Sequence, residues 1–153
     1  MQYYLSLGSN LGDREQTIRE AVHRIEQQLG TVPRCSSFYY SEPWGFQSEH
    51  PFCNICCLLE TDLQPLEVLH ATQSIERALG RTRKSHFQQR SGLTSGNEVV
   101  YEDRVIDIDL IRAFDGQKEI VWNDAVLTLP HPLWEQRDFV VVPLKEISSK
   151  KSK

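Results

Sequence analysis

The sequence has no excess of basic residues. Its 17 Lys and Arg are outnumbered by 21 Asp and Glu, which gives a formal net charge of −4. A protein that binds nucleic acid through the phosphate backbone needs a net basic face, so this composition argues against that class. It does not exclude an anionic small-molecule substrate, because a local basic cleft can lie on an acidic protein.

Long apolar runs are also missing. No stretch approaches the roughly 20 residues that a membrane-spanning helix needs, and the N-terminal MQYYLSLGSNLGD lacks the basic region and cleavage site of a signal peptide. The content of 39% hydrophobic and 25% charged residues is that of an ordinary single domain. We therefore expect a cytoplasmic domain at residues 1–147, followed by a solvated tail at 148–153.

Cysteines are few, and their spacing does not indicate a metal site. Cys53 and Cys56 form a C-x-x-C, but they lie in FCNICCLLE, which is predicted to be a strand. Residues three apart on a strand point to opposite faces, so the two thiolates could not share a zinc ion. Together with Cys35 and Cys57 they are predicted to be small buried hydrophobic residues in a reducing compartment.

The hydrophobic pattern predicts a β-α-β-β-α-β order with short strands added near the end. Strands are predicted at residues 2–7, 35–40, 52–61, 105–114, 119–122 and 139–142, and helices at 13–30 and 65–80. Two helices of this length can cover one face of a sheet. The prediction is an α+β, ferredoxin-like two-layer sandwich with a mostly antiparallel sheet.

Residues 81–103 show no sustained apolar period. The segment is basic at first, with Arg81, Arg83, Lys84 and Arg90, and later rich in Gly and Ser. Connections of this length in compact domains are usually functional lids or disordered. We predict a lid that is mobile without ligands and closes when they bind.

The strongest local signal is the run RVIDIDLI at 104–111. On a strand, Asp107 and Asp109 project from the same face, about 7 Å apart. Two like charges on one face repel unless a cation lies between them, and carboxylates without nearby His or Cys favour Mg²⁺. A solvated strand face is the alternative interpretation of this pair.

Other residues could complete such a site. A polyphosphate also needs arginines, because the guanidinium fork matches phosphate geometry, and Arg137 follows the strand in HPLWEQRDF. His131 lies between two prolines in LPHP, and a structural hydrogen-bonding role is its alternative interpretation.

Two further pairs share a face of their elements. Gln73 and Glu76 are three apart on the second helix, where ordinary surface polarity is the alternative. Phe52 and Asn54 are two residues apart on the third strand and so share a face. An aromatic ring and an amide side by side could stack on a flat heterocycle and bind its edge, or Asn54 could be a satisfied polar residue at the strand end.

From residue 3 to about 147 the chain resembles the 6-hydroxymethyl-7,8-dihydropterin pyrophosphokinase family. The similar pieces occur in the family's order: LSLGSNLGD at 5–13, SSFYYSEPWG at 36–45, PFCN at 51–54, TQSIERALGRTRK at 72–84, RVIDIDLI at 104–111 and TLPHPLWEQRDFVVVPL at 128–144. Each piece is short, but their conjunction is specific.

The resemblance implies a role for each matching position. Asp107 and Asp109 match the magnesium-binding aspartates, and Arg83 and Arg104 are the arginines implied in catalysis. The residues implied in binding ATP are Gln73, Glu76, Arg81, Arg83, Leu110, Thr128, His131 and Arg137. The residues implied in the pterin pocket are Gly8, Ser41, Glu42, Trp44, Phe52, Asn54 and Phe139, with Ser9 in the adjoining turn.

Part of the chain departs from the family pattern. Arg104 follows Tyr101, Glu102 and Asp103, after an insertion of about a dozen residues relative to the usual loop. The family usually has a Trp in this loop, but no Trp occurs between residues 45 and 121. Phe87 and Tyr101 are candidates for the aromatic that replaces it, and the choice stays open. The resemblance implies that two aromatic side chains sandwich the pterin ring, and Phe52 takes the place of a Tyr in that pair.

The implied reaction is attack by the pterin hydroxymethyl oxygen on the β-phosphorus of ATP, with two Mg²⁺ ions and release of AMP, in a monomeric enzyme of folate biosynthesis. Such transfers depend on positioning and charge neutralisation. A regulatory ligand-binding module, an RNA-binding domain of the same topology and a simple kinase are the rival classes. The chain has no G-x-x-x-x-G-K-[ST] loop and no RNP-like pattern.

Overall fold

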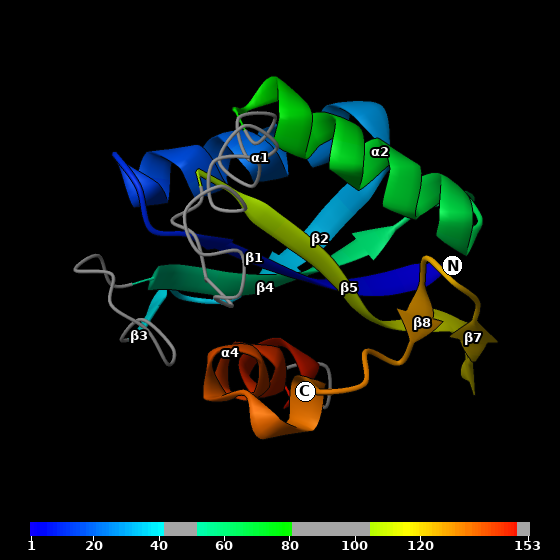
Figure 1. Cartoon of the computed structure of the whole chain (residues 1–153). Helices are drawn as coiled ribbons and strands as arrows, with labels where there is room; N and C mark the ends of the chain where they lie inside the picture. Colours follow the sequence, from blue (N-terminus) through cyan, green and yellow to red (C-terminus); the bar gives the residue numbers. More distant parts are fainter. Residues whose placement is uncertain (42–51, 81–104, 150–153) are drawn as a thin grey trace, which may run out of the picture.

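The computed structural model describes residues 1–41, 52–80 and 105–149 (Figure 1). The elements are β1 (Gln2–Ser9), α1 (Arg14–Gln28), β2 (Thr31–Cys35), β3 (Tyr39–Ser41), β4 (Phe52–Glu60), α2 (Pro65–Ala78), β5 (Asp107–Asp115), β6 (Lys118–Glu119), β7 (Trp122–Asn123), β8 (Thr128–Leu129), the 3₁₀-helix η2 (Trp134–Gln136) and α4 (Asp138–Ser149).

The main sheet is antiparallel throughout. Its strand order is β2-β4-β1-β5-β6, β3 also pairs with β4, and β7 pairs with β8 as a separate ribbon. The first, second, fourth and fifth strands with α1 and α2 make the β-α-β-β-α-β unit, with β1 and β4 in the centre. The predicted α+β, ferredoxin-like fold is confirmed, but α4 on the other face of the sheet adds a third layer to the two that were predicted.

Helix α1 begins where the sequence predicts. Asp13 is the N-cap, and its carboxylate accepts a hydrogen bond from the Gln16 amide at 3.2 Å, which satisfies one of the unpaired donors of the first turn. Ile18, Ala21 and Ile25 are buried against the sheet, so the helix buries one stripe at helical spacing.

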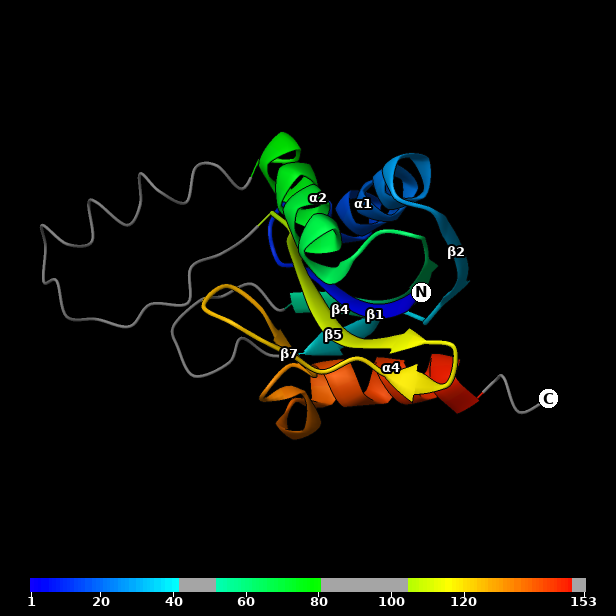
Figure 2. The same ribbon diagram turned by 90° about the vertical axis from the view of Figure 1, so that its right-hand side faces the viewer.

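Helix α2 begins at Pro65, whose fixed φ suits the first turn. The Glu67 carboxylate accepts a hydrogen bond from the backbone N–H of Gln64 at 2.8 Å and closes that turn. Its fully buried positions include Val68 and Ile75. Together α1 and α2 cover one face of the sheet, as Figure 2 shows along the helices.

The last element corrects the predicted strand at 139–142. These residues belong to α4, which covers the opposite face of the sheet (Figure 1). The β-branched run favours a strand locally, but Val140, Leu144 and Ile147 recur at helical spacing and are buried against the sheet. Burial of that stripe outweighs the small difference in propensity.

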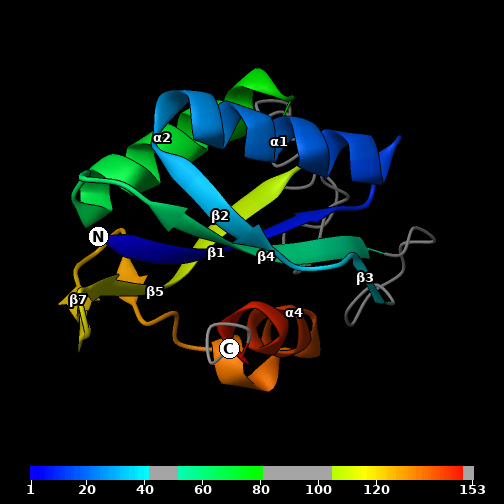
Figure 3. The same cartoon turned by 180° about the vertical axis from the view of Figure 1, so that it is seen from behind.

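The predicted strand at 35–40 is also corrected. Two strands, Thr31–Cys35 and Tyr39–Ser41, both pair with β4, and residues 36–38 join them (Figure 3). Pro33 lies inside β2, which is an edge strand with a register shift between Thr31 and Arg34. An edge strand tolerates proline because one side of its backbone needs no ladder partner.

The sheet separates two apolar clusters. Cys53 lies in the cluster under α1 and α2, whereas Cys56 lies in the cluster under α4. The prediction that these two thiols point to opposite faces is confirmed. Cys35 is exposed, so its predicted burial is wrong.

Within the described ranges, none of the helices has the length and apolar character needed to cross a membrane.

Candidate active site

Three strand ends meet at one edge of the sheet. Gly8, near the end of β1, lies opposite Asn54 of β4 on one side and opposite Asp107 of β5 on the other. The central position of β1 brings together residues from distant parts of the chain. The sheet therefore aligns an amide and a carboxylate across a glycine.

Most of the polar side chains at this edge share one face. Strand alternation places Phe52, Asn54, Asp107 and Asp109 on the α4 side, because their neighbours Cys53, Ile55, Ile106, Ile108 and Leu110 belong to the cluster under α1 and α2. Buried Ser6, opposite Asp109, belongs to this face. Sequence reasoning missed Ser6, although the alternation of Tyr4, Ser6 and Gly8 with leucines was a signal.

Gly8 leaves room for the Asn54 side chain next to β1. A Cβ atom at Gly8 would lie 2.4 Å from Asn54 Nδ2 and 3.7 Å from Phe52 Cδ1. Among the described residues, Asn54 Oδ1 and Ser9 Oγ have no hydrogen-bond partner although both are buried. Such buried groups usually bind something, so this edge is suited to a polar ligand.

Glu76 connects α2 to β5 between the two aspartates. It is buried, and its carboxylate accepts a 2.6 Å hydrogen bond from the Ile108 backbone amide. Asp107 and Asp109 flank that amide in sequence. The interpretation of Glu76 as ordinary surface polarity is wrong, because its carboxylate holds the backbone of the D-x-D strand.

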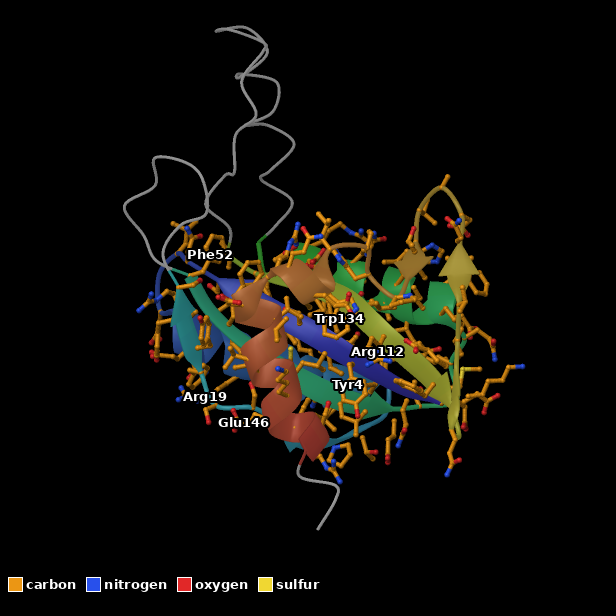
Figure 4. The ribbon with its side chains drawn as sticks, turned by 90° about the horizontal axis from the view of Figure 1, so that it is seen from below. Tyr4, Arg19, Phe52, Arg112, Trp134 and Glu146 are labelled. Carbon is orange, nitrogen blue, oxygen red and sulfur yellow. The ribbon has the colours of Figure 1, made fainter. Side chains whose placement is uncertain are left out.

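Arg112 anchors the segment after β8 to β5. Its guanidinium lies 5.1 Å from the Phe114 ring centroid and 5.4 Å from that of Trp134, and it pairs with Glu119 at 2.8 and 2.9 Å. Figure 4 shows Arg112 and Trp134 side by side, next to Tyr4. These contacts fix η2 and the residues around it against the α4 side of the sheet.

His131 and Arg137 lie on this anchored segment. The His131 amide donates to the Ile111 carbonyl at 2.8 Å, and Nδ1 accepts from the Leu133 amide at 3.2 Å, which leaves Nε2 as the ring donor. Burial lowers the pKa of His131 from 6.5, the positive charge of Arg137 lowers it further, and Asp107 opposes both. The imidazole is therefore neutral near pH 7.

This pKa shift predicts a pH dependence of stability. The unfolded state, in which His131 has its ordinary pKa of 6.5, binds a proton at this residue more readily than the folded state. The free energy of unfolding therefore decreases as the pH is lowered through this region. Without ligands, we expect wild type to lose more stability than His131→Gln between about pH 7.5 and about pH 5.5. Denaturant titrations of both proteins measure this difference, and equal losses would contradict the assignment.

The two carboxylates on β5 fit a hard divalent cation. Asp107 and Asp109 are both half-buried, and oxygen donors are the ligands of Mg²⁺. In the part of the chain that the structure describes, no group of three or more His, Cys, Asp or Glu side chains could hold a metal ion. Mg²⁺ is usually held by one or two carboxylates, with water and substrate phosphate oxygens as its other ligands.

The other candidate residues do not all lie at this edge of the sheet. Ser41 of β3 lies opposite Phe52. Phe139, in the first turn of α4, packs against the apolar cluster between α4 and the sheet, with the Arg137 guanidinium 5.8 Å from its ring. The Leu110 side chain lies in the core. Gln73 and Thr128 are exposed. Several candidates lie outside the described residues: Glu42, Trp44, Arg81, Arg83, Phe87, Arg90, Tyr101 and Arg104, with the predicted lid at 81–103.

The fold and this edge define an α+β protein with a small-molecule site, in which an aromatic–amide pair lies beside a carboxylate pair. Residues 4–149 match the model of the family described as 7,8-dihydro-6-hydroxymethylpterin-pyrophosphokinase (HPPK). The chain belongs to this family. Membership confirms the predicted class, an ATP-dependent diphosphotransferase of folate biosynthesis.

Similar proteins occur in bacteria and eukaryotes. The chain is 44% identical over 145 residues to a 2-amino-4-hydroxy-6-hydroxymethyldihydropteridine pyrophosphokinase of Porphyromonas gingivalis, covering 95% of this chain and 89% of the relative. The protein of the same name from Bacillus subtilis is 36% identical, with 94% and 76% covered. A folic acid synthesis protein of Dictyostelium discoideum is 35% identical, with 95% and 19% covered.

Proposed function

We propose that the sheet edge around Gly8 is the active site at which a diphosphate passes from ATP to the hydroxymethyl group of 6-hydroxymethyl-7,8-dihydropterin, with release of AMP. The observation that carries this proposal is the row Asn54–Gly8–Asp107 across β4, β1 and β5. It places a group suited to a heterocycle next to a group suited to a metal–phosphate complex.

The pterin subsite is built on β4. The Phe52 ring stacks on the heterocycle, and the buried Asn54 amide supplies a donor and an acceptor to its edge. The Asn54 Oδ1 atom, which has no partner among the described residues, is the acceptor available to a ring N–H. Phe139, which packs at the start of α4, is the second aromatic of the predicted sandwich.

Gly8→Ala tests this subsite. The added methyl would displace the Asn54 side chain, so we expect pterin affinity to fall roughly 10-fold, the effect of losing one buried hydrogen-bonding group. ATP affinity should change little. Calorimetric titration of each ligand measures both. In the double variant Gly8→Ala/Asn54→Ala the loss should be no greater than in Asn54→Ala, and additive losses would show that Gly8 acts independently of Asn54.

The phosphate subsite lies on β5 and the segment anchored by Arg112. Two Mg²⁺ ions held by Asp107 and Asp109 would neutralise phosphate charge when bound. His131 Nε2 and the Arg137 guanidinium are donors for the phosphate chain. Glu76 keeps the backbone between the aspartates in place. Arg81, Arg83 and Arg104 stay predictions from sequence for the remaining phosphate oxygens.

Analysis of the nucleotide product separates the proposal from its rivals. With ATP, Mg²⁺ and the reduced pterin, the proposed reaction yields AMP and a pterin diphosphate. ADP would indicate a simple kinase, and binding without turnover would indicate a regulatory module. Chromatography of the nucleotides at several time points distinguishes these outcomes.

The proposal extends to the setting of the reaction. We place the protein in the cytoplasm as a monomer that acts on small molecules and does not bind nucleic acid. The four cysteines are free thiols, which suits a reducing compartment, and the net charge is acidic. Sedimentation equilibrium tests the monomer, and a second copy in the complex would contradict it.

A further inference from the structure

Cys35 and Cys57 face one another across the pair formed by the edge strand β2 and β4. The register places Cys35 directly opposite Cys57. The adjacent Ser36 amide donates to the Cys56 carbonyl at 2.9 Å. Hydrogen-bonded and non-hydrogen-bonded pairs alternate in an antiparallel ladder, so Cys35 and Cys57 form a non-hydrogen-bonded pair.

This type of pair suits a disulfide. Its Cα atoms are about 4.5 Å apart, and its side chains are closer than those of a hydrogen-bonded pair. Disulfides span Cα separations of about 4.4–6.8 Å. The backbone of β2 and β4 can therefore accept an S–S bond between these residues without a change of register.

The two thiols differ in environment. Cys35 is exposed, whereas Cys57 is fully buried in the cluster under α1. A hydrogen bond with the Cys57 thiol lowers the pKa of Cys35, although partial desolvation of its sulfur and the charge of Glu26 oppose this effect. That hydrogen bond and burial raise the pKa of Cys57 well above its usual value. The sulfur of an exposed residue with a lowered pKa thus lies against a fully buried thiol.

The other two cysteines are not placed to compete. All four cysteines of the chain lie in the described ranges. Cys56 points to the α4 side of the sheet. Cys53 lies opposite Tyr40, four residues along β4 from Cys57. Cys35 with Cys57 is therefore the one pair that faces directly across a strand pairing.

We propose that Cys35 and Cys57 are an oxidisable dithiol, in which a hydroperoxide modifies Cys35 first and Cys57 resolves the product to a disulfide between β2 and β4. In the first step the Cys35 sulfur attacks a peroxide oxygen, the O–O bond breaks, and a sulfenic acid and an alcohol (water, from hydrogen peroxide) form. In the second step the Cys57 sulfur attacks the sulfenic sulfur, the S–O bond breaks, and the hydroxyl leaves with the Cys57 proton as water.

The two steps balance in electrons. Two thiols lose two electrons to the S–S bond, and the peroxide is reduced by two. The product ties the edge strand to the centre of the sheet, and it protects the exposed Cys35 from further oxidation. A thiol reductant restores both thiols. The inference does not depend on the proposed pyrophosphokinase reaction.

The test uses the full-length reduced protein and hydrogen peroxide. We expect the intact mass to fall by that of two hydrogen atoms, and titratable thiols in denaturant to fall from four to two. Peptide mapping without reduction should show the peptide of Cys35 joined to that of Cys57, and dithiothreitol should reverse all three changes. The melting temperature of the oxidised protein should rise, because the cross-link restricts the unfolded chain.

Three single variants locate the reaction. Cys35→Ser should form no disulfide, and Cys57→Ser should stop at a sulfenic acid on Cys35, trapped by a dione reagent. Cys53→Ser, the matched control on the same face of β4, should form the disulfide as in wild type. If Cys57→Ser does not fold, the comparison of Cys35→Ser with Cys53→Ser still decides. A disulfide between two chains, a different intrachain pair, or no loss of thiols would overturn the proposal.

Discussion

Asp107→Ala and Asp109→Ala are each expected to lower turnover by on the order of 10³-fold or more, with the fold unchanged. The two carboxylates share the α4 face of β5 next to the Asn54–Gly8 row, and both are half-buried. In the proposed site, removing one carboxylate weakens the binding of the Mg²⁺ that neutralises the phosphate charge. Phosphoryl transfer depends mainly on positioning and charge neutralisation. Steady-state assays at saturating Mg²⁺ measure the loss.

A matched control is available on the same strand. Asp115 ends β5 at the opposite edge and is exposed, so Asp115→Ala should keep turnover close to wild type. Circular dichroism and thermal unfolding of all three variants check the fold. If either site variant kept more than about a tenth of wild-type activity, Asp107 and Asp109 would not be the metal ligands.

Phe52→Ala and Asn54→Ala are expected to weaken pterin binding by about 1–3 kcal/mol each, which is roughly 5- to 150-fold in the dissociation constant. Phe52 and Asn54 lie on the same face of β4, and Asn54 is buried against Gly8. ATP binding should change much less, because the proposed phosphate subsite lies on β5 and the segment after β8, away from Phe52 and Asn54. Titration of each ligand separately gives the two affinities.

Phe114→Ala is the control for the loss of an aromatic ring. Phe114 lies on the same face of the sheet but at the far end of β5, where it packs edge-on against Tyr4 with ring centroids 6.1 Å apart. Its removal should lower stability and leave pterin affinity near wild type. Equal losses for pterin and ATP in the Phe52 and Asn54 variants would mean that these residues act through folding and do not form the pterin pocket.

Helix α4 shows where local pattern and tertiary burial disagree. The run of three valines at 140–142 predicts a strand, because β-branched residues favour that conformation. The same segment carries Val140, Leu144 and Ile147 at helical spacing, and the free face of the sheet offers Cys56 and Ile111 to cover. Only the presence of that face decides the conformation of α4.

The sequence by itself determined the faces of β4 and β5 and the starts of the first two helices. Alternation along β4 and β5 placed Phe52 with Asn54 and Asp107 with Asp109, because side-chain direction on a strand has a period of two residues. Asp13 and Pro65 marked the helix starts through capping chemistry that operates within one turn. These properties depend on neighbours a few residues away.

Only the tertiary structure decided which of these faces meet. The register of β1 with both β4 and β5 puts Gly8 between Asn54 and Asp107, and that of β2 with β4 puts Cys35 opposite Cys57. Burial of Glu76 against the Ile108 amide has the same origin. Pairings between distant segments follow from how the whole apolar surface is buried, and no local period of the sequence encodes them.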